Sequence, residues 1–141
     1  MTPVEALQAA LAGEHAAVYV YGVVGGRVSY SAEPDLWNLV RAAYALHRGR
    51  RDELVTMVRG MDAEPVAAEV SYELPNAATS PAQLKAAALE TEQRAAAVYA
   101  DVVGSTAGAA RLWAIDALED AAVRALGFGG EPSVFPGIDD L

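Results

Sequence analysis

The sequence predicts an all-α protein, a four-helix bundle with a long crossover between helices 2 and 3. Three observations support this prediction. Four segments show the 3.6-residue apolar periodicity of amphipathic helices. Residues that start and stop helices stand at the ends of these segments, and the connections between them are short, long and short. A chain of 141 residues can bury a core without disulfides or metal ions, so we expect a single domain over residues 1–141.

The four helices are expected at about residues 3–24, 34–59, 81–103 and 108–126. The first and third begin with the same device, a hydroxyl side chain at the N-cap (Thr2 or Ser80) followed directly by proline, which suits the first helical position. Glycine favours helix ends, and Gly60 and Gly127 follow the second and fourth segments. Residues 127–141 mix Gly and Pro with scattered large apolar residues, which predicts an irregular C-terminal strap packed over one end of the bundle.

The connections indicate how the helices are joined. Short connections within the first and second pairs of helices predict two antiparallel hairpins. Between the pairs lies a crossover linker, residues 61–80, which is interrupted by Pro65 and Pro75. About twenty extended residues reach about 65 Å, whereas a helix of about 26 residues is about 40 Å long. The linker can therefore run the whole length of the bundle and leave helices 2 and 3 parallel, which is the connectivity of ferritin-like bundles.

Composition and charge disfavour several classes of function. The chain has 53% hydrophobic and 21% charged residues, which is typical of a folded globular protein. Its formal net charge is -9, so we expect no nucleic-acid partner and no anionic membrane partner. The absence of cysteine removes thiolate catalysis and thiolate metal ligands. Because the N-terminal residues lack the basic region of a signal peptide and no apolar run is long enough to span a bilayer, we expect a cytoplasmic protein.

An ionisable residue interrupts the apolar stripe near the middle of each predicted helix. These residues are Glu14, His47, Glu92 and Glu119, with Arg50 one turn beyond His47. The middles of packed helices meet at one level, whichever way the helices run. Because burial of a lone charge costs several kcal/mol, such a coincidence indicates organisation. We therefore predict one central polar layer made of Glu14, His47, Arg50, Glu92 and Glu119.

The pattern of this predicted layer departs from that of the dinuclear metal bundles. In di-iron and di-manganese bundles, two helices each supply a Glu and the other two each supply a Glu-x-x-His pair. Here Tyr44 stands three residues before His47, and Ala122 stands three residues after Glu119. Half of each Glu-x-x-His pair is therefore missing, which argues against a dinuclear centre.

Two main interpretations of the layer remain open, beside that of a small ligand bound there. Three carboxylates, one arginine and a protonated His47 nearly neutralise one another without a metal ion. This is the interpretation that we favour, and it implies no cofactor. The alternative is a degenerate metal site that binds one iron or manganese ion. Its ligands would be Glu14, His47, Glu92 and Glu119.

Four runs of sequence are similar to a known family: residues 6–19 (ALQAALAGEHAAVY), 47–52 (HRGRRD), 72–75 (YELP) and 135–137 (FPG). They resemble an alanine-rich, ferritin-like domain family of unknown function from actinobacteria. The resemblance implies a ferritin-like four-helix fold. Glu14, His47, Arg50 and Arg51 match the characteristic positions of that family. The resemblance implies no established activity.

We therefore expect a non-catalytic module that binds a partner or a small ligand, without catalytic residues. The alternative is a metal-dependent oxidoreductase or a metal store of the iron or manganese type. Trp37, Tyr44 and Trp113 lie away from the centres of their apolar stripes. They predict an apolar outer face, through which the chain would form a homodimer.

Overall fold

The computed structural model describes residues 1–138, which form four long helices and no strand. The helices are α1 (Pro3–Arg27), α2 (Pro34–Arg59), α3 (Pro81–Ser105) and α4 (Gly108–Gly127). The prediction of an all-α four-helix bundle is thus confirmed. None of these helices combines the length and the apolar composition that a membrane crossing requires. The last three residues of the predicted strap, 139–141, lie outside the described residues.

The ends of the helices follow the capping signals in the sequence. Thr2 Oγ1 accepts a hydrogen bond from the Glu5 backbone N–H at 3.2 Å, and Glu5 Oε2 accepts one from the Thr2 N–H at 2.7 Å. At α3, Ser80 Oγ accepts a hydrogen bond from the Gln83 N–H at 3.2 Å, while Gln83 Oε1 accepts one from the Thr79 N–H at 3.0 Å. The first helix continues to Arg27, past its expected end near residue 24, because Val28 is buried and its N–H still reaches the Val24 carbonyl.

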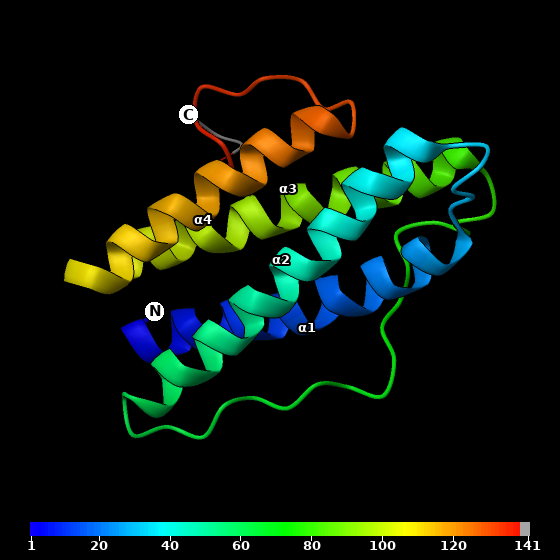
Figure 1. Ribbon diagram of the computed structural model, residues 1–141. Coiled ribbons are helices and arrows are strands. Elements are labelled where there is room, and N and C mark those ends of the chain that lie inside the picture. The colour runs from blue at the N-terminus through cyan, green and yellow to red at the C-terminus, as the bar shows by residue number, and fades with distance from the viewer. Residues whose placement is uncertain (139–141) are drawn as a thin grey trace.

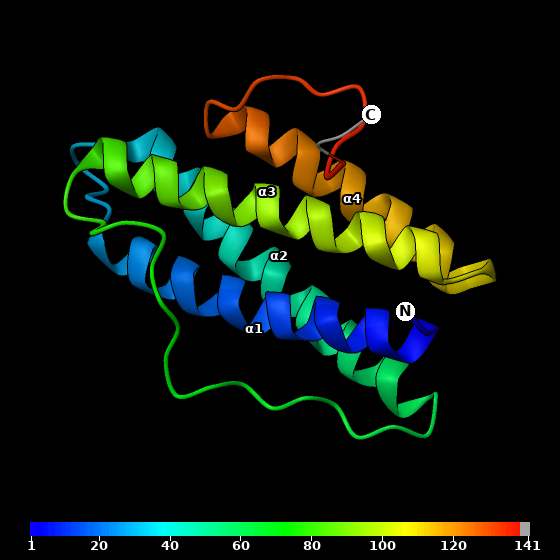
Figure 2. The same ribbon diagram turned by 180° about the vertical axis from the view of Figure 1, so that it is seen from behind.

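The helices are joined as the connections predict. Helices α1 and α2 form one antiparallel hairpin, and α3 and α4 form the other (Figure 1). The linker of residues 61–80 returns along α1 for the length of the bundle, which leaves α2 and α3 parallel (Figure 2). Side chains of α1 hold the linker. Gln8 Nε2 donates to the Glu64 carbonyl at 2.6 Å, and Arg27 Nη1 donates to the Ala77 carbonyl at 3.1 Å.

The apolar core consists of two clusters, one toward each end of the bundle. The first gathers around Tyr21, Val24 and Phe128, and the second around Leu7, Leu54 and Val102. In each of α1, α2 and α3, the residue that interrupts the apolar stripe falls between the two clusters in the sequence. A polar level near mid-bundle therefore divides the core.

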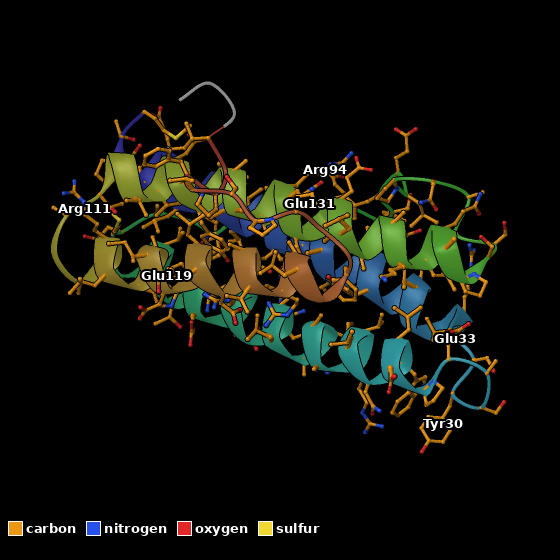
Figure 3. The ribbon with its side chains drawn as sticks, turned by 90° about the horizontal axis from the view of Figure 1, so that it is seen from above. Tyr30, Glu33, Arg94, Arg111, Glu119 and Glu131 are labelled. Carbon is orange, nitrogen blue, oxygen red and sulfur yellow. The ribbon has the colours of Figure 1, made fainter. Side chains whose placement is uncertain are left out.

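The orientation of α4 differs from the prediction. Glu119 was predicted to interrupt an apolar stripe that faces the core, but the structure turns this side of α4 outward. Leu112 is 66% exposed, Leu126 is 44% exposed, and Glu119 is exposed on α4 (Figure 3). The buried face consists of Ala114, Ala117 and Ala121. Small side chains let α4 approach α3 closely, so packing distance outweighs the larger apolar area of leucine.

The aromatic residues predicted for an outer face are half-buried. Trp37 and Tyr44 pack against the first cluster, and Trp113 packs edge-on against Tyr99 with ring centroids 5.6 Å apart. The exposed apolar side chains of α4 are aliphatic instead, namely Leu112, Val123 and Leu126.

The strap, residues 128–138, also differs from the prediction. Phe128 is buried in the first cluster, but the strap then turns back along α3 and α4 instead of covering the end of the bundle (Figure 1). Two glycines permit this path. A Cβ at Gly137, whose φ is +79°, would overlap the backbone carbonyl of Ala96, and one at Gly130 would lie 2.9 Å from Leu89 Cδ1.

Candidate functional site

Three of the predicted residues meet at the centre of the bundle. Glu14 on α1, His47 on α2 and Glu92 on α3 are each at most 2% exposed. His47 Nδ1–H donates to Glu14 Oε2 at 2.6 Å, and Nε2–H donates to Glu92 Oε1 at 2.9 Å. Both ring nitrogens donate when the two carboxylates are ionised, so this geometry requires an imidazolium between two carboxylates.

The protonation of His47 follows from its partners. Burial by itself lowers the pKa of the imidazole. The hydrogen bonds to Glu14 and Glu92, together with the charges of these carboxylates, outweigh burial and raise the pKa of His47 to about 9. At neutral pH His47 therefore carries a positive charge that the two glutamates share.

Two tyrosines complete the hydrogen bonding of the glutamates. The Tyr99 hydroxyl donates to Glu14 Oε1, and the Tyr21 hydroxyl donates to Glu92 Oε1. Burial, followed by the charges of these glutamates, raises the pKa of both phenols well above the usual range. Both tyrosines thus remain neutral donors. The Tyr21 ring also stacks on His47, with centroids 5.2 Å apart.

Two arginines extend the network toward α4. Arg124 Nη1 lies 3.7 Å from Glu92 Oε2, a buried oxygen that accepts no hydrogen bond from the residues that the structure describes. Arg124 also donates to the Asp120 carboxylate through both terminal guanidinium nitrogens, from Nη1 to Oδ2 at 2.8 Å and from Nη2 to Oδ1 at 3.1 Å. Arg50 Nη2 donates to the same Asp120 at 3.1 Å. Partial burial opposes ionisation of Asp120, but the two arginines lower the pKa of its carboxyl.

We call this whole group the polar layer: Glu14, Tyr21, His47, Arg50, Glu92, Tyr99, Asp120 and Arg124. Its three carboxylates face three cationic groups, so the layer is neutral overall. The buried ionised groups thus have compensating partners on neighbouring helices. The arrangement links all four helices at one level, and it can hold their relative positions.

The sequence-predicted residues have different outcomes. Glu14, His47 and Glu92 come together, and Arg50 joins them through Asp120 and through the Tyr99 ring, whose centroid is 5.7 Å from the guanidinium carbon. Glu119 lies outside the layer, because α4 is rotated so that its alanine face packs inward. Arg51, which matches a characteristic family position, pairs instead with the exposed Asp52 at 3.0 Å.

Four members of the polar layer were not predicted from the sequence. These residues, Tyr21, Tyr99, Asp120 and Arg124, were not singled out. One available signal was the alanine spacing on α4, 114, 117 and 121, which marks a face suited to close helix packing. Asp120 and Arg124 lie four residues apart beside that face, at the spacing of a helical ion pair.

As hydrogen-bonded in this structure, His47 presents no free lone pair to iron or manganese. An imidazole binds a metal ion through a nitrogen lone pair, but both nitrogens of His47 hold protons toward carboxylates. Arg50 and Arg124 add positive charge that would repel a dication. Within residues 1–138, no three His, Asp or Glu side chains are placed to hold a metal ion. The chemistry of the layer is therefore that of an internal salt-bridge network.

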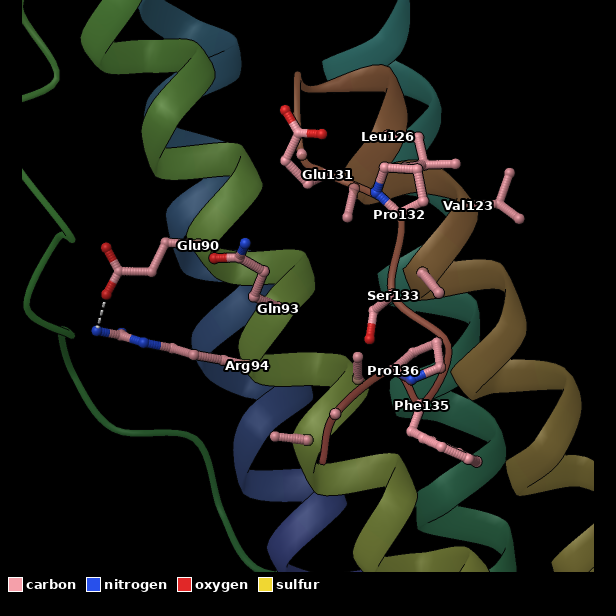
Figure 4. Close-up of a pocket in the computed structure, with 16 residues that line it drawn as sticks. Glu90, Gln93, Arg94, Val123, Leu126, Glu131, Pro132, Ser133, Phe135 and Pro136 are labelled. Atoms are coloured by element: carbon pink, nitrogen blue, oxygen red, sulfur yellow. Dashed lines mark hydrogen bonds and ion pairs between the residues drawn. The ribbon is translucent and has the colours of Figure 1, made fainter. Parts of the chain in front are cut away.

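A separate pocket lies between α3, α4 and the strap, with a volume of about 640 Å³ (Figure 4). Alanines of the two helices form much of its lining, with Val123, Leu126 and Phe135 as larger apolar groups. Its polar lining residues are Glu90, Gln93, Arg94, Glu131 and Ser133. None of the residues that line this pocket belongs to the polar layer.

The fold and these two features define a class: a four-helix bundle with a long crossover, a buried charge-balanced layer and a pocket beneath a C-terminal strap. The chain belongs to the family described as Domain of unknown function (DUF4439), whose family model matches residues 6–140. It is also similar to a conserved hypothetical protein, Rv2844, from Mycobacterium tuberculosis, known from a crystal structure. The two are 32% identical with a TM-score of 0.82, over 89% of this chain and 93% of that one. No curated protein matches the chain.

Proposed function

We propose that this protein is a non-catalytic module that binds a small molecule in the pocket beneath the strap, while the polar layer serves the fold. The observation that carries the proposal is the pocket itself. Its volume of about 640 Å³ falls within the range typical of ligand sites, about 300–1,000 Å³. An apolar lining with a few polar groups is likewise typical of such sites.

The polar layer supports a structural role because its charges compensate one another, although the buried Glu92 Oε2 has only an ion partner, Arg124, and accepts no hydrogen bond from residues 1–138. Glu14, His47 and Glu92 direct their hydrogen bonds to residues of the protein, and none of the three is more than 2% exposed. A hollow between α1 and α3 does reach Glu14 and Tyr99, but its volume is only about 90 Å³. That space is too small for a substrate of ordinary size.

Kinship with the ferritin-like proteins is part of this proposal. The short, long, short connectivity and the charged residues at mid-bundle support it. In this chain, cations of the protein occupy the role that metal ions have in the dinuclear bundles, since His47, Arg50 and Arg124 neutralise the acidic groups. We therefore propose that no metal cofactor acts in this protein, and we do not favour the oxidoreductase alternative.

The homodimer and the cytoplasmic location remain predictions. Among the exposed aliphatic side chains of α4, Leu112 lies outside the pocket beneath the strap, so it is a better candidate for the interface than the half-buried Trp37, Tyr44 and Trp113. We expect a dimer by light scattering at micromolar concentration. A monomer would show that these aliphatic side chains stay in contact with water.

The test of the proposed function is a small-molecule fragment screen by protein-observed NMR. We expect hits whose chemical-shift changes centre on the strap and on the facing residues of α3 and α4. Ala97→Phe, at an exposed lining position, should abolish these hits by filling the pocket. The same substitution at the exposed Ala45 on α2 is the control and should leave them unchanged. The proposal would be overturned if the fragments still bind to the Ala97→Phe variant, or if the screen yields no hits.

A further inference from the structure

We infer that the ligand of the pocket beneath the strap is an organic cation, a protonated amine carried on an apolar body. This inference rests on the proposed function and adds the chemical class of the ligand. Three features of the pocket point to this ligand: its apolar lining, the ionisable side chains around it, and the last turn of α4, whose residues line the same space.

The lining selects an apolar body for the ligand. Alanines at 96, 97, 122 and 125 make a smooth floor, because they project only a methyl group from each helix. Val123, Leu126 and Phe135 add larger apolar surface, and Leu126 and Phe135 are about half-exposed at 44% and 52%. An apolar ligand would cover part of this surface and remove it from water, which is favourable in proportion to the area covered.

The ionisable side chains of the pocket leave one uncompensated negative charge. Glu90 and Arg94, four residues apart on α3, form an ion pair with each other. In Figure 4 this pair lies beside α3, while Glu131 stands on the strap side. Within residues 1–138, Glu131 takes part in no ion pair. The guanidinium of Arg94 is thus engaged, and the carboxylate of Glu131 is the charge that a ligand would meet.

The end of α4 adds a second negative contribution. Ala125 and Leu126 belong to the last turn of α4, and both line the pocket. The C-terminal end of a helix carries partial negative charge, which favours a nearby cation. The contribution is small here, because the Ala125 and Leu126 carbonyls already accept hydrogen bonds from the Gly130 and Gly129 N–H groups. The formal net charge of -9 acts in the same direction, because it attracts cations and repels anions over longer distances.

Two neutral side chains offer hydrogen bonds to an ammonium group. Gln93 and Ser133 line the pocket from α3 and from the strap, on opposite walls. The amide oxygen and the hydroxyl oxygen both accept hydrogen bonds, as does the Glu131 carboxylate. An ammonium group has three N–H donors and no acceptor, so it can bind to any of these acceptors, which lie at different places along the pocket.

The test compares three probes that share one apolar body: 3-phenylpropylamine, 3-phenylpropanol and 3-phenylpropionate. Affinity is measured by NMR titration at pH 7, where the amine is protonated and the acid is ionised. We expect the amine to bind most tightly and the propionate most weakly. Glu131→Gln should weaken amine binding about fivefold, which is the size expected for an exposed charge pair, and should leave the alcohol unchanged. Glu119→Gln, an equal charge change at an exposed position outside the pocket, should change neither.

The outcomes separate this inference from the proposed function. If the alcohol or the propionate binds in the pocket as tightly as the amine, or if Glu131→Gln has no effect on the amine, the inferred ligand class is wrong while the pocket remains a ligand site. If none of the three probes binds, the inference also fails, and the fragment screen with Ala97→Phe then decides whether the pocket binds anything. The inference and the proposed function are both supported if two results are obtained. Glu131→Gln must remove the preference for the amine, and Ala97→Phe must abolish the binding of all three probes.

Discussion

The polar layer and the pocket beneath the strap differ in whether their charged side chains have partners of opposite sign. The layer is closed, and every charge in it has a partner of opposite sign on a neighbouring helix. The pocket is open to solvent, and Glu131 on its rim has no partner among residues 1–138. Compensated charge in the core stabilises one arrangement of helices, whereas uncompensated charge beside an apolar hollow is available to a ligand.

This comparison predicts that a change in the layer affects stability and that a change in the pocket affects binding. The largest effect should come from His47→Leu, which leaves Glu14 and Glu92 buried without their shared cation. Breaking a buried pair typically costs about 3–5 kcal/mol, a large share of a stability of about 5–15 kcal/mol. Urea denaturation at pH 7 measures the loss. Glu119→Gln is the control and should change the free energy of unfolding by less than about 0.5 kcal/mol.

A second pair of variants compares the two arginines of the layer. Arg124→Met should cost about 3 kcal/mol, because it removes the ion partner of the fully buried Glu92 Oε2. Arg50→Met should cost about 1 kcal/mol, since Asp120 keeps Arg124 and is about one-third exposed to water. Equal losses in urea denaturation would contradict the division of roles that the distances indicate.

The pH dependence of stability should identify His47 as a folded-state cation. Its pKa is raised from about 6.5 in the unfolded chain to about 9 in the fold. A raised pKa contributes stability that is fully present below about pH 6.5 and is lost as the pH rises through about 9. The free energy of unfolding should fall by about 3 kcal/mol over this interval. A flat profile between pH 6.5 and 9 would show that His47 is neutral, and one-bond ¹H–¹⁵N spectra of its ring provide an independent check.

Metal ions should have the smallest effect. A ligand that binds only the folded state raises its melting temperature, but the donors of the layer are already committed to one another. Added Mn²⁺, Fe²⁺ or Zn²⁺ should therefore leave the melting temperature within about 1 °C of its starting value. A rise of many degrees at near-stoichiometric metal, lost in His47→Leu, would restore the metal-site alternative.

The layer and the pocket also differ in how well the sequence predicts them. Glu14, His47 and Glu92 could be predicted because each interrupts an apolar stripe at mid-helix, and a buried charge needs a partner close by. Asp120 and Arg124 could not be placed, since they sit beside an alanine face whose inward orientation is a matter of packing. The pocket had no sequence signal, because it forms only where the strap crosses two helices.

What the sequence determined by itself was local: where helices begin and end, which pairs form hairpins, and which charged residues of α1, α2 and α3 interrupt an apolar stripe. Capping side chains, prolines and apolar periodicity act within a few residues, so they can be read without the fold. The tertiary structure alone decided the rotation of α4 and the path of the strap. Leucine and alanine are both apolar, and only the closest approach of α3 and α4 favours the smaller side chain at their contact. The strap follows α3 because Gly137 can approach the Ala96 carbonyl, a contact between residues 41 positions apart in the chain.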